Sequence, residues 1–247
     1  MKKLKHIQFI LIWLCFISQA IGSNISELQK WVAQGNSFYE KSEYQNAVTA
    51  YEKALNGNYE SAALYFNLAN AHYKLKNIAP AIYNYEKALL LNPSDVDVQT
   101  NLKYAQRMTI DDIKEIPKVG FAQMIKSFVN IMHYDTWAWL AVISFFIMLG
   151  CFIGYYLGTS TTQKRIFFIL FFVFIGLGAI SFTSGFKNRD IVNKEVFAIV
   201  FTDVISVKSE PKNNADEAFT LHEGTKVAML ESNHTWTIIQ IADGKQG

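Results

Sequence analysis

Residues 51–55 read YEKAL, and residues 85–89 read YEKAL again, 34 positions later. Two stretches of helical periodicity surround each copy, over residues 27–41 and 44–56 and then over 61–75 and 78–91. The same offset relates further pairs of residues: Gly35 with Ala69, Asn36 with Asn70, Ala47 with Ala81, Tyr51 with Tyr85, and Ala54 with Ala88. A repeat of this length with two helices in each unit predicts stacked helical hairpins.

The order of large, small and turn residues in these units resembles the tetratricopeptide repeat (TPR) family. In the second unit that pattern is carried by Tyr65, Leu68, Ala69, His72, Ala81, Tyr85, Ala88 and Pro93, and in the first by Trp31, Gly35, Phe38, Tyr44, Ala47, Tyr51 and Ala54. The first unit departs from it at Gln34 and Tyr59, where an apolar residue and a proline are usual. The resemblance implies an all-α TPR domain over residues 24–110.

Helix packing explains why small and aromatic residues alternate in this pattern. Small residues let paired helices approach, and aromatic rings fill the gaps between them. We therefore expect these packing positions: Gly35, Ala47, Tyr51, Ala54, Ala69, Ala81, Tyr85, Ala88 and Pro93. Because a repeat cannot bury its outer face alone, a capping helix is also expected, over Val96 to Ile110, with Val98, Leu102 and Ala105 directed inward.

The first helix of each pair lines the concave side of such a stack. There we predict a peptide-binding groove formed by Asn36, Tyr39, Asn70, Tyr73, Lys74 and Arg107, with Glu40 and Tyr104 beside them. In the TPR family an asparagine at the position of Asn36 and Asn70 often contacts the backbone of a bound peptide. An amide suits that role because it both donates and accepts hydrogen bonds. The alternative is a solvated polar face that binds nothing.

Two long uncharged stretches predict transmembrane helices, at residues 136–158 and 166–186. The intervening residues, 159–165, are too few for a domain and contain Lys164 and Arg165, which favours a cytoplasmic loop. Gly150, Gly154 and Gly158 recur every four residues and are expected to clear one helix face, for the second span or for another protein.

The linker over residues 111–135 contains a second apolar pattern. Phe121, Ile125, Phe128, Val129 and Met132 recur at helical spacing. This pattern predicts a short amphipathic helix that lies on the membrane surface or packs on the soluble domain.

Residues 1–22 read as an export signal. Lys2, Lys3 and Lys5 precede an apolar core from Ile7 to Ile17, and small residues stand at positions 20 and 22. We expect cleavage after Gly22, and an uncleaved signal anchor is the alternative. In either case the chain from residue 24 crosses the membrane, so the amino- and carboxy-terminal domains are expected on the same, periplasmic side.

The pattern changes to short β-rich runs in the last stretch, residues 195–247. Strands are expected at Val196–Phe201, Val204–Val207, Lys226–Leu230 and Thr235–Gln240. The segments VISVKSEP (204–211) and LHEGTKVAML (221–230), with Trp236 and DGKQG (243–247), resemble the bacterial SH3-like domain. The family pattern runs on beyond that last glycine. We therefore expect either a small all-β barrel that is truncated at its carboxy terminus or a sequence that continues.

Composition and motifs favour a binding protein over an enzyme. The net charge of +2 does not indicate nucleic acid as a partner. The two cysteines, Cys15 and Cys151, and the five histidines show no disulfide or metal-ligand spacing, and no phosphate loop or nucleophile pattern occurs. We expect no catalytic residues, no metal and no cofactor.

The whole order of segments resembles the aerotolerance-operon (Bat) TPR/SH3 membrane proteins of the BatE type. That resemblance implies a multidomain protein of the bacterial inner membrane that acts as a periplasmic scaffold in an envelope or stress-tolerance complex. It also implies von Willebrand A-domain proteins and a MoxR-type ATPase as partners. The alternative is a sensor that binds the cell wall or a peptide through its SH3-like domain.

Overall fold

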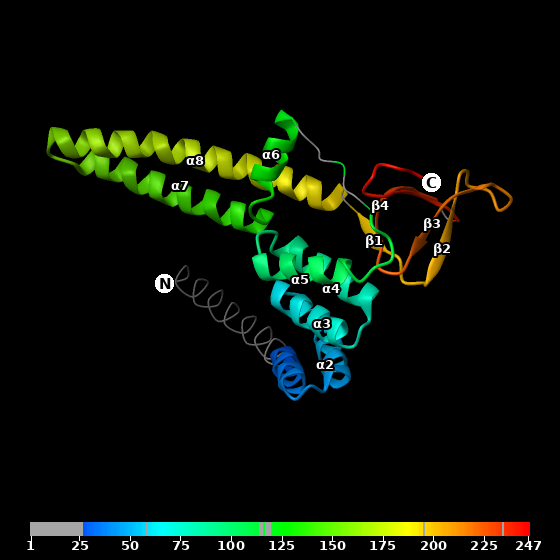
Figure 1. Cartoon of the computed structure of the whole chain (residues 1–247). Helices are drawn as coiled ribbons and strands as arrows, with labels where there is room; N and C mark the ends of the chain where they lie inside the picture. Colours follow the sequence, from blue (N-terminus) through cyan, green and yellow to red (C-terminus); the bar gives the residue numbers. More distant parts are fainter. Residues whose placement is uncertain (1–26, 58, 114–115, 117–119, 195, 234) are drawn as a thin grey trace, which may run out of the picture. The chain divides into compact units, whose positions relative to one another are not determined.

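The computed structural model of this chain describes residues 27–247 except 58, 114–115, 117–119, 195 and 234 (Figure 1). The predicted signal peptide, residues 1–22, lies outside the described residues. The chain divides into two compact units. The first holds the described residues up to Ala88 together with Asp97–Ile110, and the second holds Leu89–Val96 and Asp111–Gly247.

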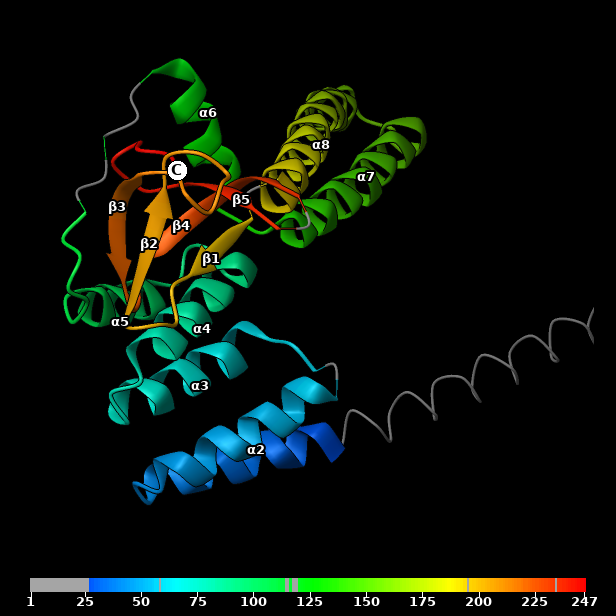
Figure 2. The same cartoon turned by 90° about the vertical axis from the view of Figure 1, so that its right-hand side faces the viewer.

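Consecutive helices form the amino-terminal part, as the periodicity predicts (Figure 2). Residues 27–40 are helical. They are followed by α2 (Tyr44–Asn56), α3 (Ala62–Lys74), α4 (Ile78–Leu91) and α5 (Val96–Gln106). Ser61 begins α3 by accepting a hydrogen bond from the backbone nitrogen of Leu64 on its side-chain oxygen at 3.1 Å, which satisfies one free N–H of the first turn.

The turn inside each hairpin also repeats. Ser42 and Lys76, 34 positions apart, both adopt left-handed backbone conformations, with φ of 62° and 64°. The nitrogen of Glu43 donates to the carbonyl of Phe38, and that of Asn77 donates to the carbonyl of His72, at 2.9 and 3.0 Å. These bonds close the last turn of the first helix in each pair and redirect the chain into the second.

The expected packing positions lie inside the repeats. Ala47, Tyr51, Ala54, Ala69, Ala81, Tyr85 and Ala88 are each at most 1% exposed; Gly35 is buried and Pro93 is half-buried. A Cβ atom added at Gly35 would collide with the ring of Tyr51, so the small residue allows this ring to fit between the two helices. In α5, Val98, Leu102 and Ala105 are buried, as expected for a cap.

In the second unit, two long helices run antiparallel beside each other: α7 (Tyr134–Leu157) and α8 (Thr161–Lys194). Both are long and apolar enough to cross a membrane, by length and composition alone. Helix α8 exceeds the expected span at both ends. It begins inside the predicted loop 159–165 and continues past residue 186 to Lys194, because the polar residues that flank the apolar stretch also continue the helix.

Small side chains line the contact between α7 and α8. Ser144 and Cys151 of α7 are buried, as are Ser181 and Ser184 of α8. Cβ atoms added at two glycines of α8 would meet α7: at Gly178 the nearest atom is Ser144 Cβ at 3.6 Å, and at Gly185 it is Trp137 Cβ at 3.2 Å. The hairpin is therefore closely packed along a seam of small residues.

The three glycines predicted to clear one helix face, Gly150 and Gly154 in α7 and Gly158 just after it, differ in their surroundings. A Cβ at Gly154 would lie 2.8 Å from the Phe167 ring of α8, whereas one at Gly150 would meet no described atom within 4 Å. Gly158 ends α7 in an extended conformation. Residues four apart are about 40° apart around a helix, so Gly150 lies off the seam. Gly154 has the expected contact with α8, and a Cβ at Gly158 would lie 3.6 Å from Lys164 Cγ near the start of α8.

A short helix, α6 (Phe121–Val129), precedes the hairpin, and five strands follow it. The strands are β1 (Phe197–Ile199), β2 (Val204–Lys208), β3 (Glu217–His222), β4 (Lys226–Ser232) and β5 (Thr237–Gln240). Antiparallel pairing gives one sheet of order β1-β4-β5 and a second made of β2 and β3. Val207, Leu221, Val227 and Ile241 form the core of this β region. Strand β3 was not predicted, although Phe219 and Leu221 alternate with polar residues.

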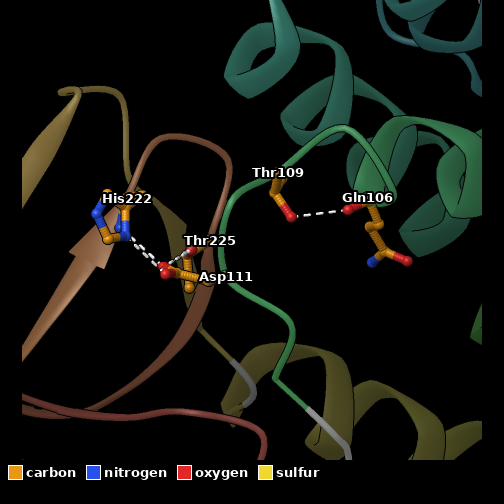
Figure 3. A network of polar contacts seen from close by, with 5 residues as sticks. All are labelled: Gln106, Thr109, Asp111, His222 and Thr225. Carbon is orange, nitrogen blue, oxygen red and sulfur yellow. Dashed lines mark hydrogen bonds and ion pairs between the residues drawn. The ribbon is translucent and has the colours of Figure 1, made fainter.

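The start of the predicted linker belongs to this β region. Ile113 packs against its core, and the nitrogen of Ile116 donates to the carbonyl of Ala242 at 3.4 Å. Asp111 accepts hydrogen bonds from Thr225 Oγ1 and from the backbone nitrogen of His222, at 2.6 and 2.7 Å, and its other oxygen lies 2.7 Å from His222 Nδ1 (Figure 3). Burial alone would raise the pKa of Asp111, but these hydrogen bonds outweigh it and hold that pKa below its ordinary value.

Candidate functional site

The two repeat asparagines are each held by a tyrosine of the same repeat. Asn36 Oδ1 accepts from the hydroxyl of Tyr51 at 2.8 Å, and Asn70 Oδ1 accepts from the hydroxyl of Tyr85 at 2.6 Å. Both tyrosines are at most 1% exposed. The YEKAL segments therefore serve two purposes: their tyrosine rings fill the core, and their hydroxyls orient a polar side chain on the first helix.

Asn36 and Asn70 each also accept a hydrogen bond from another helix, α3 for Asn36 and α5 for Asn70. Asn67 Nδ2 donates to Asn36 Oδ1 at 3.1 Å, and Asn101 Nδ2 donates to Asn70 Oδ1 at 2.9 Å. We call the four residues Asn36, Asn67, Asn70 and Asn101 the amide ladder. It runs across the face shared by the helix over residues 27–40, α3 and α5.

The ladder restricts what its first members offer to a ligand. A carbonyl oxygen has two lone pairs, and both are used at Asn36 and at Asn70, by a tyrosine hydroxyl and by a neighbouring amide. Asn36 is exposed and Asn70 is half-buried. Instead of the expected donor and acceptor, each asparagine presents its Nδ2 donors. Such a surface suits carbonyl or carboxylate oxygens.

Tyrosines surround the ladder and remain protonated at neutral pH. Burial, with smaller effects from Tyr39 and Glu40, raises the pKa of Tyr51 to about 12. Burial and the nearby Tyr39 also raise the pKa of Tyr85. Tyr39 itself is half-buried, and its ring lies edge-on to Tyr44 with centroids 5.3 Å apart. The hydroxyl protons that orient the asparagines are thus retained over the physiological range.

Two cations lie at the ends of α3 and α5. Lys74 is exposed in the last turn of α3, and Arg107, one residue beyond α5, is exposed with its guanidinium carbon 5.7 Å from the centroid of the Tyr104 ring. Tyr39, Tyr73 and Arg107 follow one another at the 34-residue offset. The structure therefore places an exposed cation near the end of each of these two helices, while Glu40 is exposed at the corresponding end of the first helix.

Asn67 and Asn101 were not among the predicted site residues. They are 34 positions apart, so the repeat offset itself could have identified them. Among the described residues, no group of three or more His, Cys, Asp or Glu side chains could hold a metal ion. His72 is half-buried, and burial lowers its pKa.

Comparison with protein families assigns the repeats. A model described as TPR repeat matches residues 35–76, and a model described as tetratricopeptide repeat matches residues 62–95. The chain therefore contains TPR repeats over residues 35–95. These repeats point to a role in protein–protein interaction. A search of curated proteins finds no match to the chain.

Proposed function

We propose that this protein is a membrane-anchored scaffold whose TPR domain binds an extended segment of another protein across the amide ladder. The observation that carries the proposal is the repeated geometry at Asn36 and Asn70, where both carbonyl lone pairs are used internally and the Nδ2 donors remain for a ligand. A peptide backbone supplies carbonyl acceptors at regular intervals. In this proposal the protein is not an enzyme, and the ladder performs recognition only.

The anchor in this proposal is the α7–α8 hairpin. Apolar side chains such as Phe146, Phe152, Phe172 and Phe182 are more than half exposed along its outer surface, while small residues fill the seam. Exposed aromatic and aliphatic side chains over two long helices are costly in water and stable in lipid. We place the hairpin in a bacterial inner membrane, with both soluble regions on the periplasmic side and the α7–α8 connection in the cytoplasm.

We further propose that the β region is an SH3-like domain and that the protein belongs to a BatE-type complex. Five short antiparallel strands in two small sheets around one core support the first point. The resemblance in segment order supports the second. Von Willebrand A-domain proteins and a MoxR-type ATPase are the corresponding partner candidates.

Retention of a partner by the full chain in detergent tests the scaffold function. The immobilised protein is incubated with a detergent extract of its source membranes, in parallel with a variant that carries Asn36→Ala and Asn70→Ala. We expect a protein that is retained by the parent chain and lost from the variant. Equal retention by the parent chain and the variant would show that the amide ladder does not take part in partner binding. Binding of both to purified cell wall would instead support a sensor that acts through the β region.

Reporter fusions test the membrane placement. A fusion at Asn213 should behave as exported and one at Gln163 as cytoplasmic. An exported reporter at Gln163 would contradict the topology.

A further inference from the structure

The carboxy-terminal end of α6 is fixed to both long helices. The carbonyl of Val129, the last residue of α6, accepts hydrogen bonds from Trp137 Nε1 at 3.0 Å and from Asn188 Nδ2 at 3.4 Å. Asn188 Nδ2 also donates to Asn130 Oδ1 at 3.0 Å. Trp137 belongs to α7, and Asn188, which is 1% exposed, belongs to α8. We call this group of contacts the Val129 node.

The node also holds α6 by apolar contact. Val129 is 3% exposed, and the Phe128 ring lies 5.6 Å from the Trp137 ring, centroid to centroid. A buried carbonyl without a partner would be costly, so the two donors make the end of α6 part of the hairpin structure. Helix α6 thus has a defined place at the base of α7 and α8.

Outside the node contacts, α6 and the turn after it expose large apolar surface, including the part of the Phe128 ring that Trp137 does not cover. Phe121 is 76% exposed and Met124 is 70% exposed, and Phe128 and Ile131 are also exposed. Residues 121, 124 and 128 follow the spacing of one helix face, and Ile131 lies in the turn that follows the helix. Three large apolar side chains on one face of so short a helix, with Ile131 in the turn after it, need a partner.

We propose that this face of α6 lies in the interfacial layer of a lipid bilayer, at the depth where the α7–α8 hairpin leaves the hydrocarbon core. The proposal rests on the membrane anchoring proposed above. The charged residues Lys187, Arg189 and Asp190 surround Asn188 on α8, and Asp135 stands two residues before Trp137 on α7. Because such charges mark where the apolar spans end, the Val129 node lies at the depth where the hairpin leaves the hydrocarbon core. The exposed face of α6 then continues the apolar surface of the hairpin.

A second copy of the chain fits this face less well than lipid does. Helix α6 has nine residues, so it is about 14 Å long. A stable protein interface buries roughly 800 Å² on each partner, which is more than one side of so short a helix supplies. Amphipathic helices of this kind bind the boundary between headgroups and acyl chains, where the apolar face is covered and the opposite face stays hydrated.

Fluorescent probes at single cysteines test the inference in the full chain. Cys15 and Cys151 are replaced by alanine, and one cysteine is introduced as Met124→Cys, Ala122→Cys, Phe146→Cys or Asn213→Cys. Ala122 is the matched control within α6, because it is also exposed and two residues separate it from Met124 by about 200° around the helix. Phe146 reports on the hairpin, and Asn213 reports on water. Each labelled protein is reconstituted into vesicles of phosphatidylcholine and phosphatidylglycerol.

The probe at position 124 should be quenched at least about threefold more by lipids spin-labelled near the headgroup than by aqueous iodide, with the reverse order at positions 122 and 213. The probe at position 146 should respond to lipids labelled deep in the acyl chain. Iodide quenching at 124 equal to that at 213, with 146 still in lipid, would overturn the α6 inference and leave the membrane anchor standing. Iodide quenching at 146 would overturn both.

Cross-linking separates lipid from a second copy. If Met124→Cys chains join through a short bismaleimide to the same extent when the vesicle lipid is increased tenfold, a protein partner covers the face and the lipid assignment is wrong. We expect the cross-linked fraction to fall with dilution.

Discussion

The hydroxyl of Tyr85 donates to Asn70 Oδ1 at 2.6 Å and thereby connects the second repeat's core to the face on which a partner would bind. The bond between Tyr51 and Asn36, 2.8 Å long, is its counterpart in the first repeat. Because both tyrosines are buried, the orientation of the surface amides depends on how well the helices pack. Folding and recognition are therefore coupled through the same side chains.

Tyr85→Phe should lower the free energy of unfolding by about 0.5–1.5 kcal/mol, since it removes one hydrogen bond from a buried donor and keeps the ring. Urea denaturation of a fragment of residues 24–115 measures the effect. Tyr104→Phe is the control. The Tyr104 side chain is exposed, so this substitution should change the midpoint little. An unchanged midpoint for Tyr85→Phe would mean that the hydroxyl bond adds nothing to stability.

Stability should fall at alkaline pH because of the buried tyrosines. The pKa of Tyr51 is raised from 10.0 to about 12, so the folded state holds its proton more tightly than the unfolded chain does. This contribution is fully present below about pH 10 and is lost as the pH rises toward about 12. Urea midpoints measured across this window should decline more steeply for the parent fragment than for Tyr51→Phe. Parallel curves would contradict the assignment.

Ala81→Leu should unfold or strongly destabilise the repeat domain. Ala81 is 0% exposed in α4, and overpacking such a site costs about 1–3 kcal/mol. Lys74→Ala, at an exposed site, should change stability by less than about 0.5 kcal/mol. Thermal melts followed by circular dichroism compare the two. Equal melting temperatures would show that the helix faces are assigned incorrectly.

Lys76→Gly should stabilise the domain by about 0.5–1 kcal/mol, because Lys76 has φ of 64° and glycine adopts this conformation without strain. The control Lys74→Gly lies in α3, where glycine should instead destabilise by about 0.5–1 kcal/mol. Denaturation midpoints that move in opposite directions for the two variants would support the turn geometry. A lower midpoint for both variants would contradict it.

Asn70→Ala should weaken partner binding by about 1–3 kcal/mol, since a bound carbonyl would lose its donor. Asn36→Ala should act similarly. Glu52→Ala is a suitable control because Glu52 is exposed on α2; Glu86, at the equivalent position, is 8% exposed and less suitable. Affinities are compared once the partner is isolated, with folding checked for each variant. Full-strength binding by both asparagine variants would show that the amide ladder is not the binding site.

Local periodicity was enough to predict the helices of the repeats, because helix formation and packing recur with the 34-residue offset. The bounds of α2 and α4 agree with those read from the sequence, and α3 is one residue shorter at each end. The two apolar helices could also be predicted, since length and uniform apolarity are properties of a single segment. Strand β3 was missed because its short alternation is weak without the partner strand β2.

Contacts between distant residues could be known only from the tertiary structure. Asp111 bonds to His222 and Thr225, more than 100 positions later, and nothing in the local pattern near Asp111 indicates those partners. Nothing in the local pattern near Val129 indicates Asn188, 59 positions later, as its hydrogen-bond partner either. The sequence by itself determined which segments form helices and which residues the repeat places on each face. Only the tertiary structure decided that Asn36 and Asn70 have used both lone pairs, because hydrogen-bond partners depend on how separate helices meet in space.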